Sequence, residues 1–182
     1  HPLPVILFSA GLTACGLYAA SKVEVNDSRI SHFRSSERIY QAATAFDRVM
    51  DGTLYLDVVI ATDQPEALYR PENLARIEKL QRFLESLPHI RGTLSLVDYM
   101  KFMNRAMTND DASAFVLPDS EDLIAQYALL YSMGESNVLA HVVDNSYKTT
   151  IVRALCNSGL FSDAKMIRDE CDRYLREEFD AP

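Results

Sequence analysis

The sequence has 182 residues, of which 48% are hydrophobic and 24% charged, with 18 basic against 26 acidic side chains and a net charge of −8. This length suffices for one domain with a buried core. The low numbers of Gly (6), Pro (7) and Cys (3) exclude collagen-like, low-complexity and disulfide-scaffold proteins. The acidic balance also argues against a nucleic-acid partner, because phosphate neutralisation needs clustered Lys and Arg.

Residues 2–21 contain no charged side chain, so every charge lies outside this apolar block. Twenty helical residues span roughly 30 Å, the thickness of the hydrocarbon core of a bilayer. Gly11, Cys15 and Ala19 form a stripe of small residues that would let another helix approach closely. We therefore predict a transmembrane helix over residues 1–21. This helix could be truncated at its N-terminal end.

Two other interpretations of the apolar block stay open. A signal peptide that has lost its basic start would also be apolar, and Leu12-Thr-Ala-Cys15-Gly resembles a bacterial lipoprotein processing box with Cys15 as the lipidated residue. Against this, residues 16–20 remain apolar where a mature lipoprotein usually becomes polar. The third interpretation is a buried helix of a soluble core. Charge does not reveal the orientation, because only one flank of the block is present.

Alternation and apolar periodicity predict the next elements of the chain. Residues 22–26 alternate as in a short strand, and a helix follows that is capped by Ser35 or Ser36 and ended by Gly52. Residues 53–62 form the strongest predicted strand, with Leu54, Leu56, Val58 and Ile60 on one face. The chain thus enters its globular part as strand, helix and strand.

The middle of the chain continues the mixed pattern. Pro71 opens a predicted helix that Pro88 stops, and residues 92–97 form a strand that leads into Asp98, the expected cap of a helix over 99–107. After a polar loop, acidic residues at the Pro118 turn favour a helix start. Gly134 ends this helix.

The last third is predicted to contain a hairpin and a helix. Residues 138–143 and 148–155 are expected to pair as strands around a turn, and Ser162 or Asp163 is expected to cap a final helix to Phe179. Helices and strands mix without strict alternation or a Gly-rich phosphate loop. We therefore predict one α+β domain over residues 22–182, with a ferredoxin-like split β-α-β arrangement.

The sequence contains no recognisable catalytic or metal-binding motif, so we predict no catalytic, cofactor-binding or metal-ligating residue. The four histidines are scattered, and Asn109-Asp110-Asp111 lacks the Gly and the closing Glu of a calcium loop. Glu121 and Asp122 are interpreted as helix-start acids rather than an acid–base pair.

Three further features have structural interpretations. Asp57, inside an apolar strand, is expected to point to water. Cys156 and Cys171 either pair as a disulfide or remain free thiols, and the burial habits of Cys favour the thiols. Asn26-Asp27-Ser28 fits a glycosylation sequon, a pattern short enough to occur by chance.

Five stretches in order carry a resemblance to a known family. The apolar block passes directly into Ser21-Lys-Val-Glu-Val-Asn26, and segments 54–60, 94–104, 122–133 and 143–153 follow collinearly. Together they resemble the resistance-nodulation-division (RND) superfamily of exporters, in particular its branch of large hydrophobic-substrate transporters, which is called MMPL-like. The likeness covers nearly the whole chain but contains no single diagnostic motif.

The resemblance implies the first membrane helix and first porter domain of a proton-driven exporter of lipids or other hydrophobic compounds. It implies a bacterial inner membrane, with the globular part on the periplasmic side. Implied partners are the membrane, a hydrophobic or lipid substrate, other transmembrane helices of the same polypeptide and a homo-oligomer, without nucleic acid or cofactor. The last strand of the domain and the acidic proton-coupling residues are expected after Pro182.

Aromatic and Met side chains are candidates for an apolar substrate path, although side chains at helical spacing more often form ordinary core. The candidates are Tyr99, Met100, Phe102, Met103, Tyr127, Tyr131 and Met133.

Overall fold

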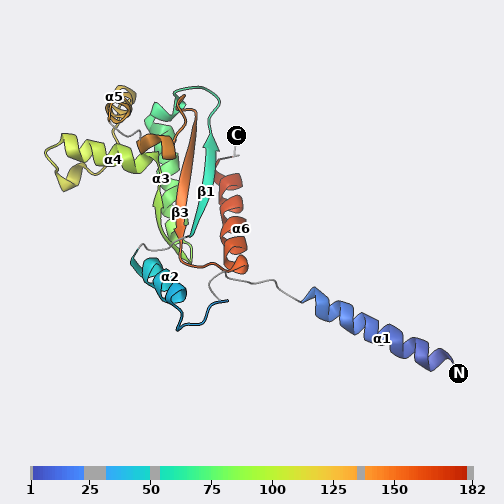
Figure 1. Cartoon of the computed structure of the whole chain (residues 1–182). Coiled ribbons are helices and arrows are strands. Elements are labelled where there is room, and N and C mark those ends of the chain that lie inside the picture. The colour runs from blue at the N-terminus through green and yellow to red at the C-terminus, as the bar shows by residue number, and fades with distance from the viewer. Residues whose placement is uncertain (1, 23–31, 50–53, 135–137, 180–182) are drawn as a thin grey trace.

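The computed structural model describes residues 2–22, 32–49, 54–134 and 138–179 (Figure 1). The chain forms a mixed α+β structure with an apolar N-terminal helix, as the sequence predicts. In order, the elements are α1 (Pro2–Ser21), α2 (Arg38–Val49), β1 (Leu54–Ala61), α3 (Pro71–Ser86), β2 (Ile90–Leu94), α4 (Leu96–Met107), α5 (Glu121–Ser132), β3 (Thr149–Cys156) and α6 (Phe161–Glu178). Short 3₁₀ turns lie at Ala67–Tyr69, Ala112–Ala114 and Val138–His141.

The three strands form one sheet in the order β1-β3-β2. Strand β3 lies in the centre and pairs antiparallel with both neighbours, with Asp57 opposite Arg153 and Leu94 also opposite Arg153. Strands β1 and β2 are therefore parallel to one another, and α3 connects them. Among the described residues, each of these two strands has one edge without a strand partner.

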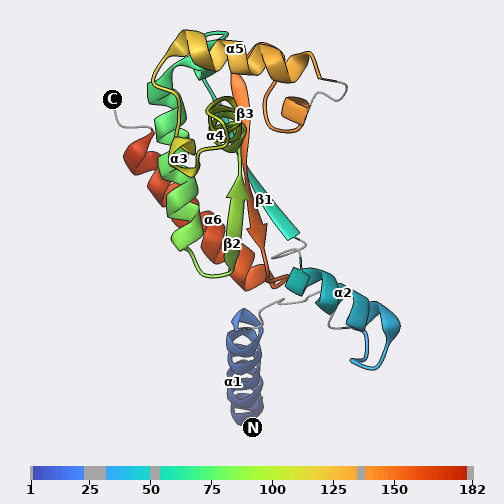
Figure 2. The same ribbon diagram turned by 90° about the vertical axis from the view of Figure 1, so that its left-hand side faces the viewer.

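One face of the sheet carries the hydrophobic core. Residues of β3 alternate between buried and half-buried, and Thr150, Val152, Ala154 and Cys156 point into the core. Figure 2 shows α3 and α6 on the same side of the sheet. Phe83 of α3 stacks on Tyr174 of α6 with ring centroids 4.1 Å apart. The core contains, among others, Leu74, Ile77, Leu80 and Leu84 of α3 with Ile167 and Cys171 of α6.

Helices α4 and α5 form an arm between β2 and β3. The Tyr127 hydroxyl donates to the Asn104 side-chain oxygen at 3.0 Å, and the Tyr131 hydroxyl donates to the Tyr99 carbonyl at 3.0 Å. The rings of Tyr99 and Tyr131 meet edge to face at 5.7 Å. In Figures 1 and 2, α5 lies at the far end of the domain from α2.

The prediction of the boundary between β2 and α4 was wrong by a few residues. The strand ends at Leu94, and Ser95 rather than Asp98 is the N-cap of α4. Asp98 is the third residue of a capping box: its carboxylate accepts from the Ser95 amide at 2.8 Å and from the Gln81 side chain at 2.7 Å. The Ser-x-x-Asp spacing therefore starts the helix three residues earlier than expected.

The prediction of a hairpin over 138–155 was half wrong. Strand β3 forms, but Val138–His141 is a 3₁₀ turn, and only Val143 bridges to Thr150. The Leu139 carbonyl accepts from the amides of both Val142 and Val143 at 2.9 Å. Because the turn uses the amides of Val142 and Val143, pairing with β3 is limited to this bridge, where the Ile151 amide donates to the Val142 carbonyl at 2.9 Å and the Asp144 amide to the Thr149 carbonyl at 3.0 Å.

The cap expected for the final helix was also wrong. Helix α6 begins at Phe161 with Leu160 at its N-cap, so Ser162 and Asp163 lie inside the first turn. The Asp163 carboxylate instead accepts from the Ser158 hydroxyl at 2.5 Å and lies 3.7 Å from His89. It ties the loop after β3 to the loop before β2.

The remaining predicted elements agree with the structure where it describes them. Helices α3 and α5 and strand β1 lie where the sequence predicts. Helix α2 also forms, but the cap expected at Ser35 or Ser36 was wrong, because the helix begins at Arg38 and the Glu37 carbonyl accepts its first helical hydrogen bond, from Gln41. Cys15, Cys156 and Cys171 are free thiols, the last two buried. The predicted strand at 22–26, the sequon at Asn26 and the helix stop at Gly52 lie largely or wholly outside the described residues.

Candidate functional site

Helix α1 is the most unusual part of the described chain. Residues Pro4–Ser21 form a helix that is long and apolar enough to cross a membrane, and none of that window is buried in the structure. Val5, Ile6, Leu7, Phe8, Leu12 and Leu17 are all exposed. A helix that is hydrophobic on every side normally lies in a core or a membrane. Because α1 lies outside the core, the third interpretation, a helix buried in a soluble core, loses its support within this structure.

The side chains that carry reactive chemistry do not gather into a site. In the part of the chain that the structure describes, no three His, Cys, Asp or Glu side chains come together to hold a metal ion. His89 pairs with Asp163, and Asp111 accepts from the amide and hydroxyl of Ser113 at 2.8 Å, which lowers the pKa of its carboxyl. Asp111 orders a local turn, and Asp163 joins two loops.

The seven candidate path residues separate into three groups in the structure. Met100 and Tyr127 are buried in the core, while Tyr99, Met103 and Tyr131 are half-buried and pack against it. Phe102 is 49% exposed and Met133 is 75% exposed. The first five therefore hold α4 and α5 together. Only the last two face outward.

The outer surface of the arm carries more apolar side chains than the candidate set. Phe102 meets Phe115 edge to face at 5.0 Å, and the Lys101 ammonium lies 5.6 Å from the Phe115 ring. Val116 of the loop after α4 and Leu129 and Leu130 of α5 are also exposed. Phe115 and Val116 are not predictable as surface residues from the sequence, because a loop position has no periodicity that would assign it to a face.

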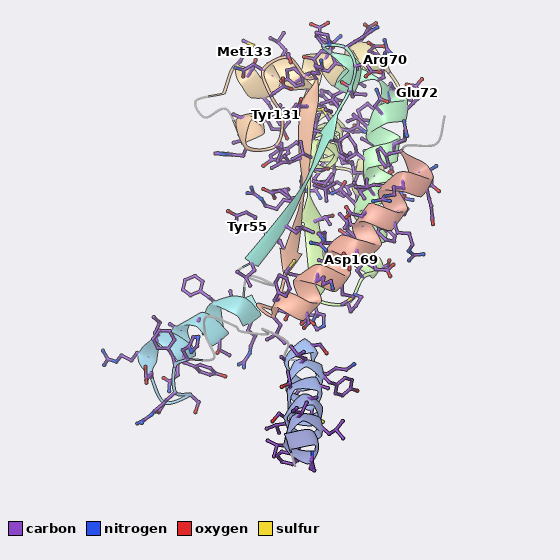
Figure 3. The ribbon with its side chains drawn as sticks, turned by 90° about the vertical axis from the view of Figure 1, so that its right-hand side faces the viewer. Tyr55, Arg70, Glu72, Tyr131, Met133 and Asp169 are labelled. Atoms are coloured by element: carbon purple, nitrogen blue, oxygen red, sulfur yellow. The ribbon has the colours of Figure 1, made fainter. Side chains whose placement is uncertain are left out.

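The sheet face opposite the core is open and mixed in character. Tyr55 and Val59 of β1 are exposed on it, and half-buried Ile151 and Leu155 of β3 lie opposite them. In Figure 3, Tyr55 points away from α6. No described helix lies over this face in Figures 1 and 2. It remains a partly apolar surface.

Asp57 lies on the open face of the sheet, as expected, but it is half-buried and paired rather than simply pointing to water. Its carboxylate accepts two hydrogen bonds from Arg153, from Nε and from Nη2, both at 2.8 Å. The guanidinium carbon of Arg153 lies 4.3 Å from the centroid of the Tyr55 ring. This ion pair raises the pKa of Arg153 further above its ordinary value. Arg153 was missed because sequence alone does not give the register that brings it opposite Asp57.

Two hollows follow the unpaired edge of β1, one at each end. The hollow at the start of β1 has a volume of about 340 Å³ and an apolar lining that includes Leu56, Phe161 and Ile167. The hollow at the end of β1 has a volume of about 770 Å³ and is bordered by Arg70 and Arg176. Both are shared between β1 and α6. Together they leave space beside the open strand edge.

A third hollow, of about 290 Å³, lies between α5 and the turn before β3. Tyr69 and Tyr147 line it with ring centroids 4.6 Å apart. Burial raises the pKa of Tyr69 to about 12, with added contributions from Tyr147 and Glu66. For Asp144, burial raises the pKa, but hydrogen bonds from Ser146, Thr149 and Lys148 outweigh it and lower the pKa below its usual value. These groups order the turn.

Comparison with known proteins finds no matching protein-family model, no matching curated protein and no matching solved structure. The geometry itself therefore carries the functional argument. It consists of an uncovered apolar helix, a small sheet with one open face, and exposed apolar side chains on the arm.

Proposed function

We propose that this chain is the first membrane helix and first extracytoplasmic domain of an RND-type exporter of the MMPL-like branch. The exporter would be driven by protons and would move lipids or other hydrophobic compounds. The observation that carries this proposal is the exposed apolar surface of α1: residues Pro4–Ser21 are uncharged, and none of this segment is buried in the structure. A lipid bilayer supplies the apolar surroundings that such a helix needs.

The surfaces of the domain support a role in handling hydrophobic compounds rather than in catalysis. Several apolar side chains of the arm are exposed, among them Phe102, Leu129 and Met133. Contiguous exposed apolar surface marks sites that contact proteins, membranes or apolar ligands, and we propose that these side chains contribute to such a surface. In the proposed exporter they would face the substrate or the other domains of the same polypeptide. The domain would lie on the periplasmic side of the bacterial inner membrane.

The finer fold that we propose is a ferredoxin-like porter domain. In support, parallel strands β1 and β2 flank antiparallel β3, and α3 joins the two outer strands. This is the connectivity of a split β-α-β unit. A further strand after α6 would pair with the open edge of β1. The hollows beside Leu56 and beside Arg176 would give it room.

The second candidate is an extracytoplasmic binding module whose apolar block is a signal sequence. The exposed thiol of Cys15 favours this alternative, since a lipoprotein is modified at such a cysteine. The two candidates differ in the fate of α1. An exporter keeps α1 as a membrane span, whereas a lipoprotein loses residues 1–14 and carries lipid on Cys15.

The test is expression of the chain in a bacterial host, followed by membrane extraction and mass determination. The exporter proposal predicts an uncleaved chain that resists alkaline carbonate extraction, in the original sequence and in Cys15→Ser alike. Leu7→Ala serves as the control, since it keeps the block apolar and lies outside the sequence Leu12-Thr-Ala-Cys15-Gly. Release of a shortened soluble domain would overturn the membrane span. Lipid labelling that disappears in Cys15→Ser would establish the lipoprotein instead.

A further inference from the structure

Helix α2 has an apolar face that no other described part of the chain covers. The spacing of Ile39, Ala42, Ala43, Phe46 and Val49 places them on one side of the helix. Ile39 is 51% exposed, Phe46 is 62% exposed and Val49 is 79% exposed. No described side chain of α2 belongs to the hydrophobic core or packs against it. The helix is amphipathic, yet its apolar face meets solvent.

The position of α2 in the chain brings it close to α1. Only residues 22–37 separate the two helices, and a chain of this length reaches at most about 55 Å when fully extended. Figures 1 and 2 show both helices beyond the end of the sheet that lies away from α5. If α1 crosses a bilayer, α2 is therefore tethered near the surface of that bilayer.

The distribution of charge favours the same placement. Residues 1–53 carry five basic and five acidic side chains, so residues 54–182 carry the entire net charge of −8. An anionic bilayer repels the acidic part of the chain but not this neutral part. Arg38 and Arg48, at the two ends of α2, can meet lipid phosphates.

The open face of the sheet is a poorer partner for α2. Its centre holds the ion pair between Asp57 and Arg153. An apolar helix face laid over this pair would remove both charges from water, and the cost of that desolvation offsets the gain from apolar contact. Lipid acyl chains cover Phe46 and Val49 without burying any charged group.

We propose that α2 lies in the membrane–water interface, with its apolar face toward the acyl chains and Arg48 toward the headgroups. Amphipathic helices of this kind bury their apolar face by about 5–10 Å. The partner is the surface of a phospholipid bilayer. The inference rests on the proposed membrane span of α1. It adds a second contact, which would hold the domain at a fixed height and orientation.

The test uses the full chain with Cys15→Ser, reconstituted into vesicles of phosphatidylcholine and phosphatidylglycerol. Cys156 and Cys171 are buried, so a fluorescent thiol label goes to one introduced cysteine. Val49→Cys reports the apolar face, and Thr44→Cys is the matched control on the polar face of the same helix. Quenching is measured with brominated acyl chains and with aqueous iodide. We expect brominated lipid to quench the Val49→Cys label several-fold more than the Thr44→Cys label, and iodide to do the reverse.

Two results would overturn the inference. Equal quenching by iodide at both positions would place the apolar face in water, and protection of Val49→Cys from both quenchers would mean that protein covers it. A label at Gly11→Cys, in the middle of α1, separates this result from the proposed function. Quenching by lipid at Gly11→Cys but not at Val49→Cys would retain the membrane span and refute only the placement of α2. Quenching at Val49→Cys alone would support the placement of α2 and count against the span.

Discussion

Arg153 and Asp57 form a two-pronged ion pair across the middle of the β1–β3 ladder, on the sheet face opposite the core. Their side chains retain 32% and 28% of their full exposure, and the Tyr55 ring covers the guanidinium from one side. The pair fixes the strand register from the open face. Packing fixes the same register from the core face, through Val58 opposite Val152.

Replacing either partner of this pair should weaken the sheet. We expect Asp57→Asn and Arg153→Lys each to lower the free energy of unfolding by about 1 kcal/mol, because both disturb the paired hydrogen bonds in a half-exposed setting. The double variant should lose less than the sum. The measurement is urea denaturation followed by circular dichroism. Asp110→Asn is the control, since the more exposed Arg105–Asp110 pair should contribute close to nothing.

Met100 and Met133 test which arm residues form the core. Met100→Ala should lower the free energy of unfolding by roughly 2–5 kcal/mol, because it leaves a cavity among fully buried side chains. Met133→Ala should leave stability unchanged, since its side chain already meets solvent. Equal effects of the two variants on the thermal midpoint would contradict the assignment of Met100 to the core.

The capping box of α4 gives a third prediction. Asp98→Ala should destabilise the domain by about 1–2 kcal/mol, because the amide of Ser95 and the side chain of Gln81 lose their acceptor. Asp122→Ala removes an exposed acid from the first turn of α5 and should cost only a few tenths of a kcal/mol. A chemical denaturation series on both variants measures the difference.

Long periodic elements were predictable from sequence because their patterns are local. The apolar stripe of α3, its Pro71 start and its Pro88 stop all appear within sixteen to eighteen residues. Strand β3 was equally recognisable. The errors occurred where short-range hydrogen bonds decide the outcome. The sequence around Asp98 is compatible with Asp98 as the N-cap of α4 and also as the third residue of the helix, which is its actual place. The apolar run at 138–143 is compatible with a strand, but in the structure the Leu139 carbonyl closes a turn there.

The candidate surfaces were less predictable than the elements, because exposure depends on distant parts of the chain. Helical spacing puts Ile39, Phe46 and Val49 on one apolar face, but only the structure reveals that nothing in the described chain covers it. Tyr131 and Met133 are two positions apart and equally apolar in pattern, yet only Tyr131 finds Tyr99 to pack on. The partner of Asp57 likewise depends on a register set across almost one hundred residues.

Alkaline pH should destabilise the domain through Tyr69. Its pKa is about 12 in the folded state and 10.0 as the reference value, so the unfolded chain loses this proton first as the pH rises. The contribution of Tyr69 is fully present below pH 10, declines as the pH rises toward 12 and is then lost. Burial also raises the pKa of Tyr131, Tyr147 and Tyr174, so these residues add to the loss of stability at alkaline pH. The free energy of unfolding should fall less steeply between pH 10 and 12 in Tyr69→Phe than in the original sequence. Tyr18→Phe is the control, and urea denaturation at several pH values measures the difference.

Thiol chemistry should distinguish the three cysteines. Burial raises the pKa of both Cys156 and Cys171, and for Cys171 the neighbouring Asp172 adds to the shift. Both should resist alkylation in the folded protein and react after unfolding, because the thiolate is the reacting form. Cys15 is exposed and should react in detergent. Mass spectrometry after timed alkylation measures each rate, and rapid modification of Cys156 or Cys171 without denaturant would contradict their burial.

The central position of β3 has a consequence for biosynthesis. Strands β1 and β2 emerge from the ribosome early, but neither pairs with the other, and their common neighbour Thr149–Cys156 is made only after the whole α4–α5 arm. Until then, both strands, including the apolar β1, remain without backbone partners, a state that favours aggregation and slow folding. Such a chain depends on being shielded during translation, and its sheet closes in one late step.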